Sequence, residues 1–184
     1  MKKYTLLYKL KEYDKETYLH SLRVAKLTLK LIENELFNKE EREKIYWAAL
    51  LHDIGKMNIK REVLFTKSIF TEAEFNEMKK HARYGHDIII SEIGDEKIAR
   101  IVLEHHERND GSGYPEHKEK GNILTESKII AIADSYDAMS SKRRYKESLG
   151  LDKILNEFQS IKNQYDDYYL KKLFKLNGYT EDKE

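Results

Sequence analysis

Apolar residues recur at steps of three and four positions along almost the whole chain. Tyr18, Leu22, Ala25, Leu29 and Ile32 follow this pattern. Residues at this spacing lie on one face of a helix, and such a face must be buried against other elements. No segment alternates apolar and polar residues as a half-buried strand does. The sequence therefore predicts an all-α fold.

Capping residues and glycines set the limits of the expected helices. Asp14 suits an N-cap, and Thr71 followed by Glu74 has the pattern of a capping box. Gly55 and Gly94 interrupt the helical pattern. We expect helices at about 14–37, 39–53, 59–65, 71–92, 96–107 and 127–140, a loop at 108–122, and two more helices after residue 150.

At 184 residues the chain is long enough for one domain with a buried core. We expect that domain to span 1–149, with about 13 residues ahead of the first predicted helix as a short N-terminal segment. Because so little precedes this helix, the domain is expected to be free-standing. Residues 150–184 are expected to form a helical extension packed on the domain or on a partner, such as a second copy.

The charge balance excludes some partners. Lys and Arg total 34 and Asp and Glu total 33, so the chain lacks the excess of basic residues that is typical of DNA-binding proteins. The chain has no cysteine, so disulfides and thiolate metal ligands are excluded. No apolar run approaches the ~18 residues that would span a membrane. We expect a cytoplasmic protein.

Two short segments concentrate metal-binding residue types. His52 and Asp53 end an apolar helical pattern and are followed by Lys56, and His105 and His106 precede a glycine-rich loop. Imidazole and carboxylate ligands together suit Fe, Mn, Zn or Co better than Ca or Mg. This mixture is typical of a metal-dependent phosphoester hydrolase.

Further candidates lie elsewhere in the chain. Glu16 and His20 are four residues apart on one helical face. Asp134 ends an apolar run, so its carboxylate needs a metal, an ion pair or several hydrogen bonds. Asp137, one turn later, is expected to hold a histidine ligand or a substrate group. His81 lies between the charged and apolar faces of its predicted helix.

The combined pattern resembles the HD-GYP domain, a branch of the HD phosphohydrolase superfamily. The matching motifs are Glu16 with His20, His52-Asp53-Ile54-Gly55-Lys56, His81, His105-His106-Glu107, Asp110-Gly111-Ser112-Gly113-Tyr114-Pro115 and Asp134-Ser135-Tyr136-Asp137. The match covers roughly residues 14–149. It departs from the usual family pattern at His81-Ala82 and at Arg143-Arg144-Tyr145, where proline is common. His86 and His117 fall outside the motifs and are expected to be surface histidines.

The resemblance implies a single HD-type helical bundle with two or three divalent metals, Fe or Mn first and Zn, Co or Ni as alternatives. The implied ligands are Glu16, His20, His52, Asp53, His81, His105, His106 and Asp134. Asp53 would bridge two metals, and Glu16 would add a third. Lys56 would lie beside the bridging hydroxide and the scissile phosphate. The implied substrate contacts are Lys56, Gly113, Tyr114, Asp137, Arg143 and Lys146.

The implied activity is hydrolysis of cyclic di-GMP to pGpG or GMP by the metal-bridging hydroxide. Two alternatives remain open: a nucleotide-binding signalling module with weak catalysis, and a phosphodiesterase for another cyclic dinucleotide such as cyclic GMP-AMP. A homodimer or a signalling-protein partner is also compatible with the sequence. Tyr114 either stacks on a guanine or braces its loop.

Overall fold

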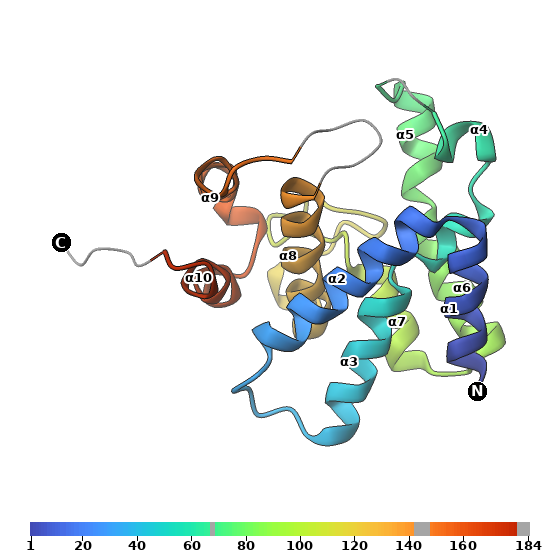
Figure 1. Cartoon of the computed structure of the whole chain (residues 1–184), viewed down its shortest axis with the longest axis horizontal. Coiled ribbons are helices and arrows are strands. Elements are labelled where there is room, and N and C mark those ends of the chain that lie inside the picture. Colours follow the sequence, from blue (N-terminus) through green and yellow to red (C-terminus); the bar gives the residue numbers. More distant parts are fainter. Residues whose placement is uncertain (67–68, 142–147, 180–184) are drawn as a thin grey trace.

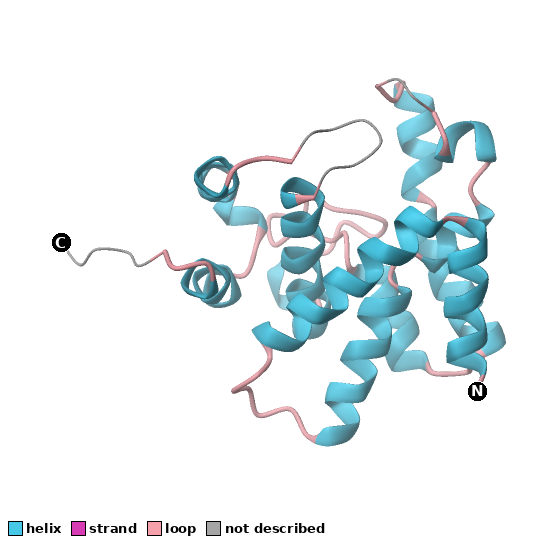
Figure 2. Ribbon diagram, viewed as in Figure 1, coloured by secondary structure: helices cyan, strands magenta, loops and turns pink. Residues whose placement is uncertain are grey.

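The computed structural model describes residues 1–66, 69–141 and 148–179. Its α-helices are α1 (Lys2–Tyr13), α2 (Lys15–Leu31), α3 (Lys39–Leu51), α4 (Arg61–Leu64), α5 (Glu72–Lys79), α6 (His81–Glu92), α7 (Glu96–Glu104), α8 (Thr125–Ser140), α9 (Leu151–Ser160) and α10 (Asp167–Leu176). Short 3₁₀ turns lie at Ile54–Asn58, Lys120–Asn122 and Lys162–Gln164, and the described ranges contain no β-strand (Figure 2). The predicted all-α fold is confirmed, with α9 and α10 as extra C-terminal helices.

The N-terminal residues form a helix that the sequence pattern did not predict. In α1 only Leu6 and Leu10 are buried, so its apolar stripe is limited to two side chains. They join the main core, and α1 packs against α2 and α3. Asp14 separates the two helices, and its carboxylate accepts the N–H of Glu16 as the predicted N-cap of α2.

Helix α2 ends at Leu31 and not near residue 37 as expected. The guanidinium of Arg42 donates hydrogen bonds to the carbonyl oxygens of Ile32, Glu35 and Phe37 at 2.8, 2.6 and 3.0 Å. A connection that leaves the helix exposes these backbone oxygens, and the guanidinium satisfies them. The helix therefore ends where the Arg42 guanidinium can replace the hydrogen bonds that these carbonyl oxygens would accept within a helix.

The single helix expected over 71–92 is divided into α5 and α6. The capping box at the start of α5 is present, with Glu74 N–H donating to the Thr71 hydroxyl and Thr71 N–H to the Glu74 carboxylate. At the end of α5, Lys80 N–H donates to the carbonyl of Glu77, three residues earlier. This tighter turn lets α6 begin at His81.

The core lies where α2, α3, α7 and α8 meet (Figure 1). Side chains of this core without solvent exposure include Val24, Leu31, Leu51, Ile98, Ile101, Ile129 and Ile130. Helices α9 and α10 pack on α8, and their Phe158 and Leu173 are fully buried in the same core. No helix in the described part of the chain is long and apolar enough to cross a membrane.

A close backbone approach fixes α6 against the 3₁₀ turn Ile54–Asn58. A β-carbon on Gly55 would lie 2.0 Å from the carbonyl oxygen of His81 and 2.4 Å from the amide nitrogen of Gly85. Only a residue without a β-carbon fits at this contact. The glycine of the His52–Lys56 segment therefore sets the distance between Asp53 and His81.

We predict that Gly55→Ala lowers stability by about 1–3 kcal/mol or more, because backbone atoms must move to admit the methyl group. For a chain of this size this corresponds to a melting temperature lower by about 2–12 °C, measured by thermal denaturation. Gly121→Ala is the matched control, since nothing lies within 4 Å of a β-carbon there. Equal melting temperatures for the two variants would contradict the close-contact argument.

Candidate metal centre

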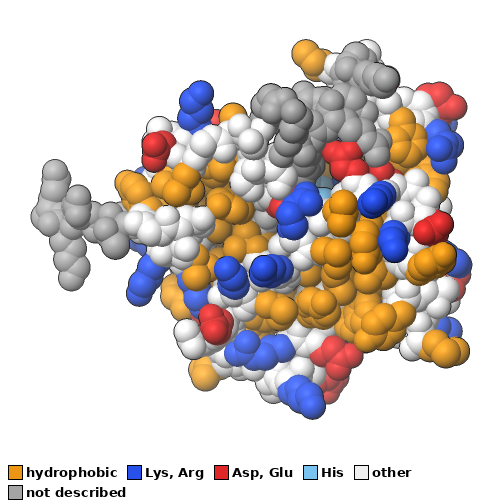
Figure 3. Space-filling model, viewed as in Figure 1, with side chains coloured by type: hydrophobic (Ala, Val, Ile, Leu, Met, Phe, Trp, Pro, Cys, Tyr) orange, Lys and Arg blue, Asp and Glu red, His pale blue; other side chains and the backbone are white. Residues whose placement is uncertain are grey.

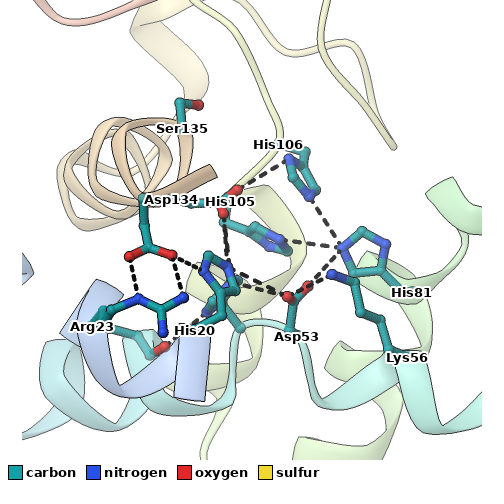
Figure 4. A network of polar contacts seen from close by, with 12 residues as sticks. His20, Arg23, Asp53, Lys56, His81, His105, His106, Asp134 and Ser135 are labelled. Atoms are coloured by element: carbon teal, nitrogen blue, oxygen red, sulfur yellow. Dashed lines mark hydrogen bonds and ion pairs between the residues drawn. The ribbon is translucent and has the colours of Figure 1, made fainter. Parts of the chain in front are cut away.

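Side chains from α2, α6 and α8 meet those of the segments that follow α3 and α7 (Figure 4). His20 comes from α2, His81 opens α6, and Asp134 belongs to α8. The remaining members follow the ends of α3 and α7: His52, Asp53, His105 and His106. All except His106 are buried, with at most 9% of each residue exposed. In the view of Figure 3 only a small patch of histidine surface is visible.

Three of these histidines are oriented by the same local hydrogen bond. The Nδ1 atoms of His52, His81 and His105 lie 2.8, 2.6 and 2.5 Å from the carbonyl oxygens of the residues three positions earlier. A carbonyl oxygen only accepts, so Nδ1 must carry the proton in each ring. The Nε2 atoms then carry lone pairs directed into the cluster. This is the orientation of a metal-binding histidine.

The Nε2 atoms crowd together in a way that a bound cation would stabilise. His81 Nε2 lies 3.3 Å from His105 Nε2 and 3.1 Å from His106 Nε2. His81 and His105 both present lone pairs, so no hydrogen bond joins them. His52 Nε2 is buried and has no hydrogen-bond partner within the described ranges. Burying unsatisfied acceptors is costly, and a divalent cation bound between them removes that cost.

Two carboxylates complete the donor set. Asp53 lies between the histidines, with Oδ2 3.4 Å from His52 Nε2 and Oδ1 3.4 Å from His81 Nε2. Asp134 Oδ1 is 3.0 Å from His20 Nε2. Ligand atoms within 4.8 Å of one another form three sets: His81, His105 and His106; His20, His52 and Asp134; and His52, Asp53 and His105. The sets share His52 and His105, and their imidazole and carboxylate donors fit a divalent metal.

The protonation states suit metal binding. Burial lowers the pKa of His81 to about 4, and the nearby Asp53 carboxylate only partly opposes it. Burial, together with the neighbouring imidazoles, holds the pKa values of His105 and His106 well below the usual range. Burial alone would raise the pKa of Asp53, but the Lys56 ammonium and the imidazoles hold it well below its usual range. At neutral pH His81, His105 and His106 therefore offer uncharged nitrogens and Asp53 an ionised carboxylate. Burial alone would lower the pKa of His52, but the Asp53 and Asp134 carboxylates raise it.

Three histidines of the cluster, His20, His81 and His106, line a cavity of about 290 Å³. Glu16, Arg23 and Lys56 lie along the cavity, with His20, His81, His106 and Tyr114. Lys56 Nζ is 2.7 Å from Asp53 Oδ2. Glu16 belongs to none of the three close ligand sets, although it lies along the same cavity as His20.

Asp137 holds a histidine of the cluster. Its Oδ2 lies 2.7 Å from His20 Nδ1, and its carboxylate accepts two hydrogen bonds from Arg23 at 2.7 and 2.9 Å. The carboxylate is 5% exposed and is engaged by these two residues. Sequence reasoning missed Arg23, although its position three residues after His20 places it on the same helical face.

The glycine-rich loop packs tightly beside the histidines. The Tyr114 ring stacks on His106 with centroids 4.7 Å apart, and the Lys79 ammonium lies 5.7 Å from the Tyr114 centroid. Gly113 is buried, and a β-carbon there would lie 2.4 Å from the amide nitrogen of Arg108. These contacts favour the loop-bracing role for Tyr114.

Buried Glu107 anchors the far side of this loop, and sequence reasoning missed its role. Its two carboxylate oxygens accept the backbone N–H groups of Glu116 and Lys118 at 2.7 and 2.9 Å. Glu107 is only 3% exposed. A carboxylate directly after two ligand histidines is the signal that could have identified it.

The remaining predicted positions lie apart from the cluster. His117 is exposed, and His86 is half-buried and pairs with Asp87 at 2.8 Å. Arg143 and Lys146, predicted substrate contacts, lie outside the described residues.

The chain is similar in sequence to a family model and to several phosphodiesterases of cyclic dinucleotides. The model of the HD domain family matches residues 17–139. A cyclic di-GMP phosphodiesterase of Thermotoga maritima is 39% identical over 163 residues, which cover 85% of this chain and 43% of that protein. A 3'3'-cGAMP-specific phosphodiesterase 1 of Vibrio cholerae is 33% identical and is matched over 76% of this chain and 32% of its own length.

The chain thus spans less than half the length of these relatives. Among solved structures, an HDG"Y"P protein of Bdellovibrio bacteriovorus superposes with a TM-score of 0.73 over 89% of this chain and 53% of its own, at 14% identity, and supports the fold. The chain belongs to the HD domain family of metal-dependent phosphohydrolases, in the HD-GYP branch that its motifs indicate.

Proposed function

We propose that this chain is a metal-dependent phosphodiesterase that hydrolyses cyclic di-GMP. The observation that carries the proposal is the convergence of histidine nitrogens and the Asp53 carboxylate on overlapping ligand sets beside a cavity that His20, His81 and His106 line. The named activities of the relatives support the cyclic dinucleotide as substrate class. The cytoplasmic location expected from the sequence is part of the same proposal.

The donor set suits two or three divalent ions, Fe or Mn first, with Zn, Co or Ni as alternatives. When bound, such ions lower the pKa of a water molecule and withdraw charge from the phosphodiester. The ligands would be His20, His52, Asp53, His81, His105, His106 and Asp134, with Glu16 for a third ion. Asp53 occupies the position between histidines of different sets, which supports a bridging role.

The chain itself supplies orientation and charge. Lys56 lies along the cavity beside Asp53, where its ammonium can donate to a non-bridging phosphate oxygen. The backbone carbonyls behind His52, His81 and His105 hold the proton of the neutral ring on Nδ1, so that Nε2 already faces the cluster. Departure of a ribose 3′-oxygen makes pGpG the first product, and a second cleavage gives GMP. Asp137 and Gly113 would act indirectly, through His20 and the loop backbone.

Asp53→Asn should lower cyclic di-GMP hydrolysis by more than about 100-fold, because a neutral amide bridges cations poorly. Product chromatography measures the hydrolysis rate, while metal analysis and circular dichroism check that the variant keeps its metal and its helical fold. Asp87→Asn is the matched control, because Asp87 is exposed on α6 and bonded only to His86 in the described residues. Full activity in Asp53→Asn would refute the bridging role, and no hydrolysis by the metal-loaded wild type would refute the activity itself.

Running cyclic GMP-AMP beside cyclic di-GMP in the same assay decides the preferred dinucleotide. Tight binding without turnover of either compound would favour a nucleotide-binding signalling module.

Glu16→Gln should lower the metal-to-protein ratio by about one ion per chain, because the amide is a weaker ligand than the carboxylate. Metal analysis of protein purified without oxygen gives the ratio directly. Glu33→Gln, at an exposed position after α2, is the control. An unchanged ratio in Glu16→Gln would contradict a third site that depends on Glu16.

A further inference from the structure

A second, smaller apolar cluster lies apart from the main core. Ile59, Val63 and Leu64 form its buried part, and Phe70 and Met78 pack against it while remaining half-buried. Leu64, Phe70 and Met78 also line the cavity above the metal centre. We call these three residues the apolar wall. The cavity is therefore lined by charged side chains and by apolar ones.

The apolar wall is fixed relative to the metal ligands. The backbone carbonyl of Met78 accepts the Nδ1 hydrogen of His81 at 2.6 Å, so a wall residue and a ligand histidine share one hydrogen bond. Phe70 directly precedes Thr71, whose capping box with Glu74 sets the start of α5. Both half-buried wall residues are thus attached to structured backbone beside the cluster.

Tyr114, the aromatic residue expected from the sequence to stack on a base, is already engaged. Its ring stacks on His106, and the Lys79 ammonium lies over it. A base stacked on Tyr114 would have to displace one of these contacts. Phe70 and Met78 have no comparable ring partner within the described ranges, and they border the cavity directly.

The size and polarity of the cavity indicate what it holds. Its volume of about 290 Å³ is at the lower end of small-molecule pockets, so it accommodates one nucleotide and not a whole cyclic dinucleotide. Lys56 and the histidines among the lining residues suit a phosphate. The apolar wall suits a flat, weakly polar group. A nucleotide carries both groups.

We propose that Leu64, Phe70 and Met78 form a nucleobase subsite that receives one base of the cyclic dinucleotide while its phosphate lies at the metal centre. This inference rests on the proposed function. The wall side chains have no hydrogen-bonding groups beyond the weakly accepting Met thioether, so stacking and apolar contact supply the affinity. The subsite therefore accepts guanine and adenine alike, and base selection depends on other residues.

Direct binding tests the subsite without requiring turnover. Metal-loaded wild type, Phe70→Ala and Met78→Ala are titrated calorimetrically with GMP, AMP and inorganic phosphate. We expect each variant to bind both nucleotides about 10-fold more weakly, equivalent to about 1.4 kcal/mol, and phosphate unchanged. The Met78 substitution leaves in place the backbone carbonyl that holds His81. Phe75→Ala is the matched control, because Phe75 is 45% exposed on α5 and does not line the cavity.

Unchanged nucleotide affinity in both wall variants, or equal losses for phosphate and nucleotides, would overturn the subsite. Metal content and melting temperature are measured for each variant, and Phe70→Leu, which keeps apolar contact without an aromatic face, replaces Phe70→Ala if the latter unfolds. If the wild type cleaves no cyclic dinucleotide and the wall variants still bind nucleotides more weakly than it does, the subsite stands and the proposed function is refuted.

Discussion

The hydrogen bond from a histidine Nδ1 to the carbonyl three residues earlier determines the character of this centre. It occurs at His52, His81 and His105, each time at the start or end of a helix. One contact fixes the ring plane, the tautomer and the direction of Nε2. The helical bundle then has to bring these helix ends together beside His20 of α2 and Asp134 of α8, and burial lowers the pKa values of His81 and His105. Helix termini therefore orient three of the candidate ligands.

Much of this arrangement could be predicted from the sequence because its signals are local. Helical spacing, the Asp14 cap and the Thr71 capping box act within a few residues, and the structure retains them. The ligand residues were recognisable because their motifs are compact. Their assembly around one centre required no long-range inference beyond the family resemblance.

The features that prediction missed depend on contacts between distant segments. The end of α2 depends on hydrogen bonds from Arg42. Helix α1 is held by Leu6 and Leu10, whose burial depends on the core residues that they contact. The roles of Arg23 and Glu107 became visible only when Asp137 and the loop backbone were placed beside them. Such partners leave no periodic signal in a single sequence.

His20 differs from the other oriented histidines, because a carboxylate lies behind its ring where a carbonyl lies behind theirs. A carboxylate partner makes an imidazole a more basic ligand, and Arg23 keeps that carboxylate in place. The ions of the cluster would then be chemically unequal, with the strongest donor on the α2 side. Metals bound at such a centre would leave in sequence under a chelator, and a partly loaded protein would be a distinct species.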